Sequence, residues 1–380
     1  MKARYQYRFY PTDQQRMSLA QLFGCVRVVW NDALALCKQS QKLPSNGDLQ
    51  KLVLTQAKKT EQRSWLSSVA SIALQQSVAD LGIAYKNFFD SLKGKRKGKK
   101  LGSPKFKKKS NQQSARLTRG GFSILHETVY LAKIGNVNPI WSRKLPSEPS
   151  SVTIIKDAAH RYFLSFVVEV EPININAKNK SIGIDLGIKT FAVMSDGEKA
   201  ESPNYSRLDK RLRRKQKQLA RQIKDSKRRS KTRIQIAKLH NKITDTRKDF
   251  LHKLSTKIVS ENQTIILEDL NVSAMVKNRK LSRAISLQGW REFRTLSEAK
   301  SQKYNREFVV ISRWEPTSQV CSECGYKWGK LDLKVRTVQC LNCGTEHDRD
   351  DNAAKNINKV GIGHCHDSKC TSRQSKTSNG

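Results

Sequence analysis

Two pairs of cysteines in the last quarter of the chain constrain its fold more than any other feature. The pairs have the form C-x₂-C, 15 residues lie between them, and their members are Cys321, Cys324, Cys340 and Cys343. Gly325 and Gly344 follow the two pairs and allow the tight turn that aims both thiolates of a pair at one ion. Four thiolates around one ion predict a structural zinc site of the zinc-ribbon type, with no open position for chemistry.

The alternative for these cysteines is a disulfide or a redox pair. The first residues, MKARYQYRFYP, lack the apolar core of a signal peptide. The sequence also contains no run of about 18 apolar residues, so no membrane span is expected. We therefore expect the chain to stay inside the cell, where thiols are reduced, and this favours zinc. His347 is surplus to a four-cysteine site. The other cysteines are Cys25 and Cys37, expected to be buried thiols of a helix, and Cys365 and Cys370, weak metal ligands beside His364 and His366.

The charge of the chain predicts its partner. Among 380 residues, 73 Lys and Arg stand against 33 Asp and Glu, which gives a formal net charge of +40. An acidic polymer is the natural partner of such a chain, and nucleic acid fits best because Lys and Arg neutralise phosphates and release their counterions. A basic surface of the ribosomal or merely solubilising kind is the alternative. The length allows two or three domains.

The first half of the chain predicts a helical block between strands. Residues 3–9 alternate as a strand does, and Thr12 with Gln15 forms a capping box that opens a helix to about residue 37. A second helix is expected at about 68–92. Residues 93–109 contain ten basic and no acidic residues, which is typical of a flexible basic loop, either a solvated linker or a grip on a phosphate backbone. Strand patterns return at about 121–170, and these strands could close a small β-barrel with the N-terminal one.

The second half begins with an apolar strand, a tight turn and another strand at 181–197. Two very basic helical stretches follow at about 205–228 and 230–260, and they should form a pair with one packed and one cationic face. The strand TIILEDL, a helix at about 288–303 and the strand FVVIS come next. The final 20 residues are rich in Ser, Lys and Thr and are expected to be disordered.

Three acidic residues are candidates for chemistry. Asp185 and Glu268 each end an apolar strand, and Asp350 precedes the apparent helix NAAKNINKV. Carboxylates delivered at strand ends can hold two Mg²⁺ ions about 3.5–4 Å apart, as a two-metal phosphodiesterase requires. Each acid also has a purely structural alternative: Asp185 could cap a turn, Glu268 could pair with a surface lysine, and Asp350 could cap its helix.

Five short segments resemble the hallmark motifs of one family. They are GIDLG (183–187), LEDLNV (267–272), TSQVCSECG (317–325), CLNCG (340–344) and DRDDNAAKNI (348–357). In order and spacing they resemble the motifs of TnpB, a transposon-encoded family related to the type V CRISPR effector nucleases. The N-terminal half is similar only in layout and in phrases such as GSPKFK.

The resemblance implies an α/β and α+β multidomain protein. A RuvC-like nuclease domain of the RNase H fold is expected at 179–316 and 345–362, with a zinc ribbon at 317–344 and a disordered tail at 363–380. A β-barrel wedge domain at 1–11 and 116–178 would hold a helical recognition domain at 12–115, with the basic loop 93–109. The family's metal-binding acids map onto Asp185, Glu268 and Asp350, with Asp348 and Asp351 as competitors for the last position.

The function that this resemblance implies is RNA-guided, Mg²⁺-dependent cleavage of DNA. The implied partners are a guide RNA made from the transposon end and double-stranded target DNA beside a short target-adjacent motif, with no membrane. A monomer in the bacterial or archaeal cytoplasm, associated with the nucleoid, is expected. Two rivals remain: a transposase that acts on the ends of its own element, and a catalytically silent RNA-guided DNA binder or RNA chaperone.

Overall fold

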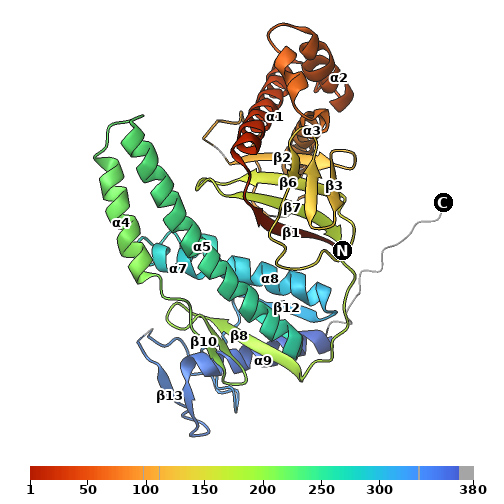
Figure 1. Ribbon diagram of the computed structural model, residues 1–380. Coiled ribbons are helices and arrows are strands. Elements are labelled where there is room, and N and C mark those ends of the chain that lie inside the picture. Colours follow the sequence, from red (N-terminus) through yellow and green to blue (C-terminus); the bar gives the residue numbers. More distant parts are fainter. Residues whose placement is uncertain (97, 111, 333, 368–380) are drawn as a thin grey trace, which may run out of the picture. The chain divides into compact units, whose positions relative to one another are not determined.

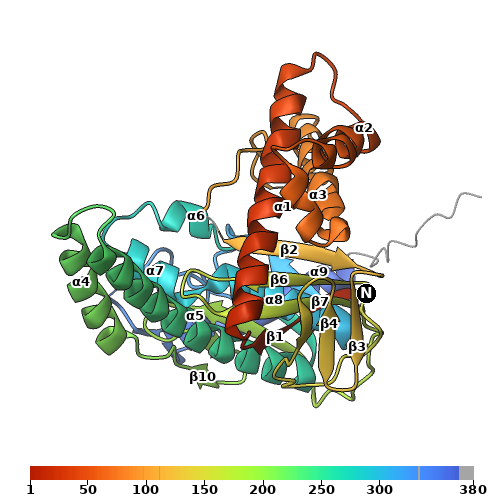
Figure 2. The same cartoon turned by 45° about the horizontal axis from the view of Figure 1, so that its top comes forward.

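The chain folds into two compact units (Figures 1 and 2). The computed structural model describes residues 1–96, 98–110, 112–332 and 334–367. Unit 1 comprises Met1–Val170 with Arg233–Lys238, and unit 2 comprises the rest of the described chain from Glu171 onward. The division near residue 170 falls a few residues before the boundary at 178 that the sequence suggested.

Unit 1 contains two antiparallel sheets, and each β-strand packs one apolar face inward. The four-stranded sheet has the order β1-β7-β6-β2, with β1 (Lys2–Phe9), β2 (Gln113–Thr118), β6 (Ser151–Lys156) and β7 (Tyr162–Glu169). The three-stranded sheet has the order β3-β4-β5, with β3 (Phe122–Leu125), β4 (Thr128–Leu131) and β5 (Gly135–Val137). Strand β2 begins inside the range that the sequence assigned to helices.

Among the described residues, the two sheets contact each other through packed aromatic side chains and are not joined by a continuous β-ladder. Among the described residues, an isolated bridge between Phe9 and Pro139 links the end of β1 to the segment after β5. The rings of Tyr7, Trp141 and Phe166 pack together, with centroids 4.7–5.9 Å apart. The expected single closed barrel is therefore replaced by two sheets that meet through a common core.

The helical segment of unit 1 lies between β1 and β2. Its elements are α1 (Asp13–Gln39), α2 (Asn46–Gln50), the π-helical turn η1 (Lys51–Gln56), the 3₁₀ turns η2 (Ala57–Lys59) and η3 (Ser64–Ser68), and α3 (Ser71–Leu92). The capping box of Thr12 and Gln15 is present at the start of α1. Apolar residues of α1 and α3 belong to the same core as the sheets. By length and composition α1 could also cross a membrane. However, half of its 18-residue apolar stretch is buried inside the protein.

The basic loop 93–109 is partly fixed rather than wholly flexible. The side chain of Asn31 in α1 accepts a hydrogen bond from the backbone N–H of Lys107 at 2.8 Å and donates one to its carbonyl at 3.1 Å. The indole N–H of Trp30 donates to the carbonyl of Lys105, and the Lys107 ammonium lies 3.8 Å from the centre of the Trp30 ring. The end of the loop is thus bound to α1 by hydrogen bonds and a cation–π contact.

Unit 2 is built on a five-stranded mixed sheet with the order β10-β9-β8-β11-β12. The strands β8 (Asn179–Leu186), β11 (Asn262–Glu268) and β12 (Glu307–Ile311) are parallel, while β9 (Ala192–Met194) and β10 (Lys199–Ala200) are antiparallel additions. Parallel strands need crossover connections, and here helices supply them.

Helices cover both faces of this sheet. The elements between β10 and β12 are α4 (Ser206–Ala220), α5 (Lys227–Glu261), α6 (Val272–Met275), α7 (Ser282–Gln288) and α8 (Trp290–Lys303). Apolar side chains of α5 and α8 pack on one face, in the cluster that contains Leu251, Phe293 and Leu267. The last helix, α9 (Arg349–Asp367), packs on the other face through Ile357, against Ile266. It extends five residues into the expected tail, and residues 368–380 lie outside the described chain.

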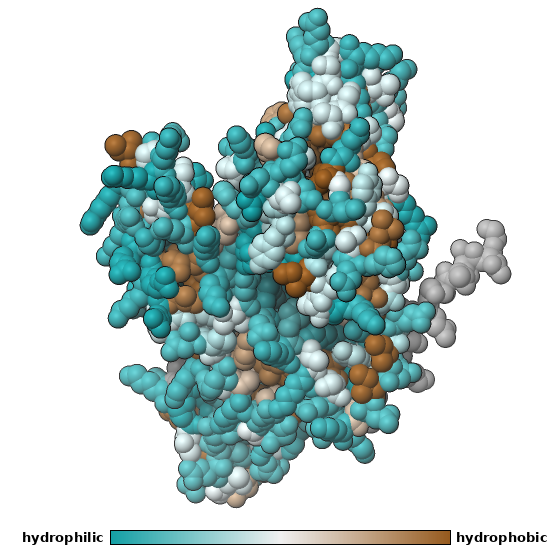
Figure 3. All heavy atoms as spheres, viewed as in Figure 1, coloured by the Kyte–Doolittle hydropathy of each residue, from teal (hydrophilic) through white to brown (hydrophobic). Residues whose placement is uncertain are grey.

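The helical pair α4 and α5 follows the charge pattern of the sequence. Between Arg207 and Arg233 the chain has 14 basic and two acidic residues, while α4 buries Leu212 and exposes most of its Lys and Arg. The surface over the pair is mainly hydrophilic in the view of Figure 3. The prediction of two basic helices is confirmed, with a turn at Arg221–Ser226 between them.

Helix α9 lies unusually close to the sheet because two glycines leave room for it. A Cβ atom at Gly183 in β8 would lie 2.4 Å from the carbonyl oxygen of Ala354 and 2.4 Å from the backbone nitrogen of Asn358. A Cβ atom at Gly361 in α9 would lie 2.4 Å from the side chain of Ile266 in β11. Any larger residue at either glycine would push the helix and the sheet apart.

We expect Gly361→Ala to lower the free energy of unfolding by about 1–3 kcal/mol, because the added methyl group overlaps the buried Ile266 side chain. Gly363→Ala in the same helix is the matched control, since nothing lies within 4 Å of its Cβ position. A helical Gly→Ala change without a clash stabilises by up to about 1 kcal/mol. Urea unfolding of the full chain measures both, and equal stability of the two variants would contradict the close packing.

Candidate functional site

The alternation of side chains along the strands aims two acids at α9. In β8, Ile182 and Ile184 face the α5 and α8 cluster, so Gly183 and Asp185 share the α9 face. In β11, Ile266 faces α9, and Glu268 lies two residues farther on the same face. Because β8 and β11 are adjacent and parallel, both acids lie at the same edge of the sheet.

The three acids near the start of α9 have different partners. The Asp348 carboxylate accepts hydrogen bonds from the backbone N–H groups of Asp350 at 2.9 Å and Asp351 at 3.1 Å, so it caps the helix. Asp351 forms an ion pair of 3.1 Å with Lys199 on β10. Asp350 forms an ion pair of 3.2 Å with Arg336 and acts electrostatically on Asp185. Of the three acids, Asp350 is thus the one that acts on the carboxylate of β8.

The charges of Glu268 and Asp350 act on the buried carboxyl group of Asp185. Burial raises the pKa of Asp185 to about 7, and the negative charges of Asp350 and Glu268 add to this shift. Burial likewise raises the pKa of Glu268; the charge of Asp269 adds to it, while Arg313 opposes it. The structure therefore brings together the three acids that the sequence singled out, and their mutual repulsion is the kind that a bound cation relieves.

The chemistry of these acids suits a hard divalent cation. Among the described residues, the cysteine cluster is the group of three or more potential ligands whose atoms all lie within 4.8 Å of one another. The three carboxylates do not form a second group of that kind among the described residues. Oxygen ligands from three carboxylates, with the remaining positions left for water and phosphate oxygens, fit the preferences of Mg²⁺.

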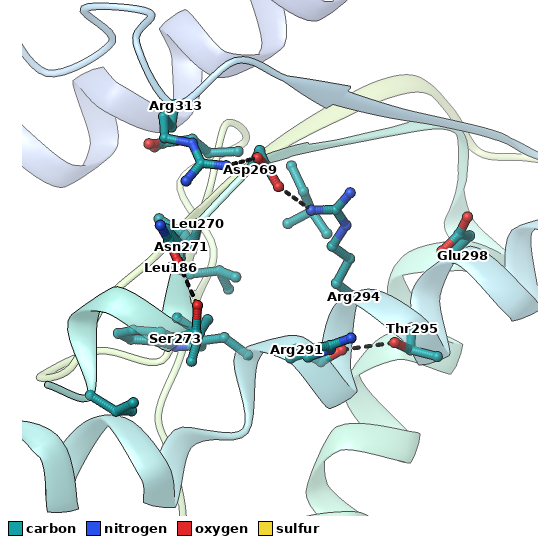
Figure 4. A pocket seen from close by; sticks show the side chains of 15 residues that line it. Leu186, Asp269, Leu270, Asn271, Ser273, Arg291, Arg294, Thr295, Glu298 and Arg313 are labelled. Carbon is teal, nitrogen blue, oxygen red and sulfur yellow. Dashed lines mark hydrogen bonds and ion pairs between the residues drawn. The ribbon is translucent and has the colours of Figure 1, made fainter. Parts of the chain in front are cut away.

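A cavity of about 530 Å³ opens beside Glu268. Its lining includes Arg291 and Arg294 from α8 and Arg313 after β12. Figure 4 shows Asp269 between two of these cations: its carboxylate accepts a hydrogen bond of 2.5 Å from Arg294 and another from Arg313. These bonds hold the pKa of Asp269 below its usual range. Of the three candidate acids this lining contains Glu268, and Arg291 is the arginine of the lining that Asp269 does not bind, so Arg291 and Glu268 give the cavity one cation and one carboxylate that Asp269 does not engage.

Sequence reasoning missed the arginines of this cavity and the role of Asp269. The motif LEDL places the two acids side by side, but it does not tell which one pairs with arginine. Arg294 lies 25 residues after Asp269 and Arg313 lies 44 residues after it. Only the fold brings them together.

The four cysteines form two equivalent turns around one point. Cys321 Sγ lies 3.7 Å from Cys343 Sγ, and Cys324 Sγ lies 3.5 Å from Cys340 Sγ. Four sulfurs about 2.3 Å from one zinc ion would lie roughly 3.8 Å apart, so the cluster has the size of a tetrahedral site. In both turns the glycine after the pair has a positive φ, +77° at Gly325 and +72° at Gly344.

The backbone of the two turns repeats the same hydrogen bonds. The N–H of each of these glycines donates to the carbonyl of the first cysteine, at 3.0 and 2.9 Å. Each first cysteine in turn donates its N–H to the carbonyl of the residue five positions on, at 2.9 Å in both turns. This paired geometry presents all four thiols to one ion, as the sequence predicted for structural zinc.

The ribbon extends past its expected end at residue 344. Strands β13 (Thr337–Gln339) and β14 (Glu346–Asp348) form an antiparallel hairpin around the second cysteine turn, and β14 ends at the cap of α9. His347 on β14 is buried, and its Nε2 lies 3.1 Å from Cys321 Sγ. It can donate a hydrogen bond to a zinc-bound thiolate from outside the four-cysteine set.

Of the remaining cysteines the structure describes Cys25 and Cys37, which lie outside this cluster. Cys25 and Cys37 are buried thiols of α1, as predicted, and burial raises the pKa of Cys25 to about 11. The side chains of His364, Cys365, His366 and Cys370, considered as weak metal ligands, lie outside the described part of the chain.

Two asparagines of α9 connect the helix to the ribbon. Asn352 accepts a hydrogen bond from the backbone N–H of Ser322 at 2.8 Å and donates one to the carbonyl of Val320 at 2.8 Å. Asn356, one turn later, donates to the carbonyls of Thr317 and Val320 at 2.8 and 2.7 Å. The motif DRDDNAAKNI therefore serves two purposes: its acids act at the sheet edge and its asparagines hold the first cysteine turn.

Three family models match the chain. The OrfB model of IS605, described as "Probable transposase", matches residues 165–279, and the Cas12f1-like TNB domain matches residues 290–357, which include the cysteine ribbon. An OrfB model described as a helix-turn-helix domain matches residues 1–42. The structure of those residues is a strand followed by one continuous helix of 27 residues.

Relatives cover nearly the whole chain. The protein named "Putative RNA-guided DNA endonuclease" from Streptomyces pristinaespiralis is 42% identical over 374 residues, which span 95% of this chain and 90% of that protein. The protein named "Putative RNA-guided DNA endonuclease InsQ" from Escherichia coli K12 is 29% identical over 381 residues, 94% of this chain and 92% of that one.

A solved structure shares the fold. The protein in the cryo-EM structure of the Cas12f1–sgRNA–target DNA complex superposes with a TM-score of 0.51 at 15% identity, over 90% of this chain and 81% of that one. The fold and the cysteine cluster define an α/β multidomain protein of the Cas12f-like class with a zinc-ribbon-like TNB domain. Within that class the chain belongs to the TnpB family, the OrfB proteins of IS605-type elements, and the resemblance seen in its motifs is confirmed.

We expect Cys321→Ser to lower the zinc content of the purified protein below one ion per chain and to reduce its folded yield, because three thiolates leave the shell incomplete. Elemental analysis measures the zinc directly. Cys25→Ala is the matched control, since this buried thiol of α1 lies outside the cluster. Unchanged zinc in Cys321→Ser would contradict the assignment.

The stability of the folded protein should depend on pH through the ionisation of Asp185. Because its pKa in the folded chain is about 7, well above its usual 3.8, the folded state holds this proton more tightly than the unfolded state. Without divalent cations, ionisation of Asp185 should therefore make the protein less stable as the pH rises from about 4 to about 7. Asp185→Asn removes this loss, and at pH 8 in buffer without Mg²⁺ its Tm should exceed that of the parent by at least about 2 °C.

Thermal unfolding at pH 5 and pH 8 measures this difference. Asp196→Asn, in the exposed turn before β10, is the control for the loss of one negative charge. Adding Mg²⁺ at pH 8 should raise the Tm of the parent more than that of Asp185→Asn. Parallel pH curves for the parent and Asp185→Asn would show that Asp185 is not held in a repulsive cluster.

Proposed function

We propose that this protein is an RNA-guided DNA endonuclease of an insertion sequence, which hydrolyses DNA phosphodiester bonds with Mg²⁺ at sites beside a short target-adjacent motif. The observation that carries the proposal is the convergence of Asp185, Glu268 and Asp350 at one edge of the sheet, where the charges of Glu268 and Asp350 add to the effect of burial and raise the pKa of Asp185. The names of the relatives and the Cas12f-like fold support the same activity.

The proposed site lies in a RuvC-like domain formed by unit 2. Its mixed sheet, with α9 on one face and α5 and α8 on the other, suits the RNase H fold that the family implies. The zinc-binding ribbon would be its insert, with Cys321, Cys324, Cys340 and Cys343 as ligands. Unit 1 would hold the wedge domain in its sheets and the recognition domain in α1–α3.

The residues of the site would have different roles in hydrolysis. Asp185, Glu268 and Asp350 would hold two Mg²⁺ ions, and these ions, when bound, would supply an activated water and charge stabilisation for the leaving oxygen. Arg291, next to Glu268 in the cavity, would bind a phosphate that flanks the scissile one. Asp269 keeps Arg294 and Arg313 in place through its hydrogen bonds and leaves Glu268 free for the metal.

The basic surfaces would bind the nucleic acids. The exposed Lys and Arg of α4 and α5 and those of the loop 93–109 provide positive charge without base-specific geometry, which suits a guide RNA and its duplex with DNA. Base pairing would then read the sequence. We propose that the protein acts as a monomer in the cytoplasm, at the nucleoid.

We expect Asp350→Ala to reduce the rate of guided DNA cleavage by more than about 100-fold, because the loss of outer-shell partners of a metal already costs about 10–100-fold. Asp351→Ala is the matched control: it removes a neighbouring acid that pairs with Lys199 and should retain cleavage within a few-fold. Both variants should bind RNA as the parent does. Equal loss in both variants would remove Asp350 from its assigned role.

The bound RNA separates this proposal from its rivals. Expression with the native flanking DNA, followed by sequencing of the co-purified RNA, should yield one structured RNA that ends in a variable segment copied from beyond the element. That RNA should program Mg²⁺-dependent cutting of a matching duplex. Strand transfer of the element's ends without RNA would favour a transposase, and guided binding without cutting would favour a silent binder.

A further inference from the structure

A second cavity, in unit 1, has no role in the nuclease site. It has a volume of about 440 Å³, large enough for a small ligand, and lies where the end of β1, the start of α1 and the β6–β7 turn meet. Its lining contains cations and aromatic rings and no acidic residue; the polar and aromatic members are Arg8, Tyr10, Arg16, Lys156, His160, Arg161 and Tyr162.

Part of the positive charge in this cavity has no counter-charge among the residues that the structure describes. The Nε of Arg8 is buried and makes no hydrogen bond within the described chain. Lys156 forms no ion pair with the described acids; its ammonium lies 5.5 Å from the centre of the Tyr162 ring. Arg16 and Arg161 pair with Asp13 and Asp157, which face them from outside the lining. A buried guanidinium nitrogen without a partner is costly, and an anion in the cavity would supply the missing acceptor.

An exposed aromatic ring stands at the same cavity. Tyr10 exposes 64% of its surface, although it directly follows the buried Phe9 of β1. The guanidinium of Arg8 lies 4.8 Å from the centre of its ring. Pro11 follows Tyr10 and restricts the backbone around it. A ring held in this way, beside unpaired cations, is the kind of surface on which a nucleobase stacks.

The remaining neighbour is His160, at the tip of the β6–β7 turn. Its backbone has a φ of +62°, and its N–H donates to the carbonyl of Asp157 at 3.0 Å. Burial and the nearby charge of Lys156 lower the pKa of its imidazole, so it is neutral at pH 7. The neutral ring can donate or accept one hydrogen bond with a sugar or base edge.

We propose that this cavity binds one unpaired nucleotide of a single-stranded nucleic acid, with the phosphate on Arg8 and Lys156 and the base stacked on Tyr10. A phosphate alone would satisfy the cations but would leave Tyr10 without a role. A duplex offers phosphates, but its bases are already stacked on one another. The site lies within unit 1 and is independent of the metal chemistry of unit 2.

The test follows Tyr10 directly, because a chain with a net charge of +40 binds nucleic acid at many places. The full chain is labelled with 3-fluorotyrosine, and the ¹⁹F signals of Tyr10 and Tyr130 are assigned with Tyr10→Phe and Tyr130→Phe. Tyr130 on β4 is 43% exposed and serves as the internal control. The probes, added in buffer without Mg²⁺, are a 5′-phosphorylated RNA tetranucleotide, its DNA counterpart, a blunt duplex and inorganic phosphate.

We expect the RNA or DNA tetranucleotide to shift the Tyr10 signal saturably and to leave Tyr130 unchanged. The tetranucleotide that binds more tightly shows whether the nucleotide in the cavity belongs to RNA or to DNA. Arg8→Gln should weaken this response by about 5-fold or more. Lys156→Gln should lower the slope of log affinity against log salt by about 0.7, whereas Lys133→Gln on the β4–β5 turn should not.

Two results would overturn the proposal. The first is a Tyr10 signal that stays in place while the tetranucleotides saturate the protein. The second is an equal shift from inorganic phosphate or from the blunt duplex, since either would show that no unpaired base is stacked. Neither result depends on whether the protein cleaves DNA.

Discussion

The close contact between α9 and the sheet of unit 2 is the constraint on which the candidate site depends. Gly183 and Gly361 let the helix approach β8 and β11 to distances that a Cβ atom would block. The strands present Asp185 and Glu268 toward this helix, and the first turn of the helix carries Asp350. If the helix moved outward, the first two acids would keep their places while the third would leave the edge of the sheet. The glycines therefore determine whether three separate segments make one site.

The cysteine ribbon depends on the same helix. Asn352 and Asn356 hold the backbone that leads into the first cysteine turn, and Asp348 ends β14 while it caps α9. The ribbon and the helix are thus joined by hydrogen bonds between side chains and backbone groups at one end of α9, close to Asp350. A zinc ion that orders the cysteine turns would also order these bonds, since metal binding contributes directly to folding. In this way the four-cysteine site, which has no open position for chemistry, can support the candidate carboxylate site, which has one.

The sequence predicts those features that depend on neighbours along the chain. The capping box at Thr12, the basic helices and the spacing of the cysteines are local patterns, and the structure contains them. The sheets of unit 1 depend on which strand edges meet, and alternation does not contain that information, so the expected barrel differs from the two sheets found. The same holds for Asp269, because its arginines come from distant segments. The choice of Asp350 over Asp348 rested on the family motif, and the capping hydrogen bonds of Asp348 supply a physical reason for it.

In a chain with so many cations, a carboxylate remains available to a metal only if the nearby arginines and lysines have other partners. Arg313 is close enough to lower the pKa of Glu268, yet its guanidinium binds Asp269, the next residue. At the other side of the site, Lys199 pairs with Asp348 and Asp351. Neighbouring acids thus occupy the cations that would otherwise neutralise the cluster. Among the described cations, Arg336 is the one that forms an ion pair with Asp350, at 3.2 Å and with both groups partly exposed, and such a pair is weak enough to be exchanged for a divalent cation. The runs of consecutive acids in the two motifs are therefore explained by the charge of the chain around them.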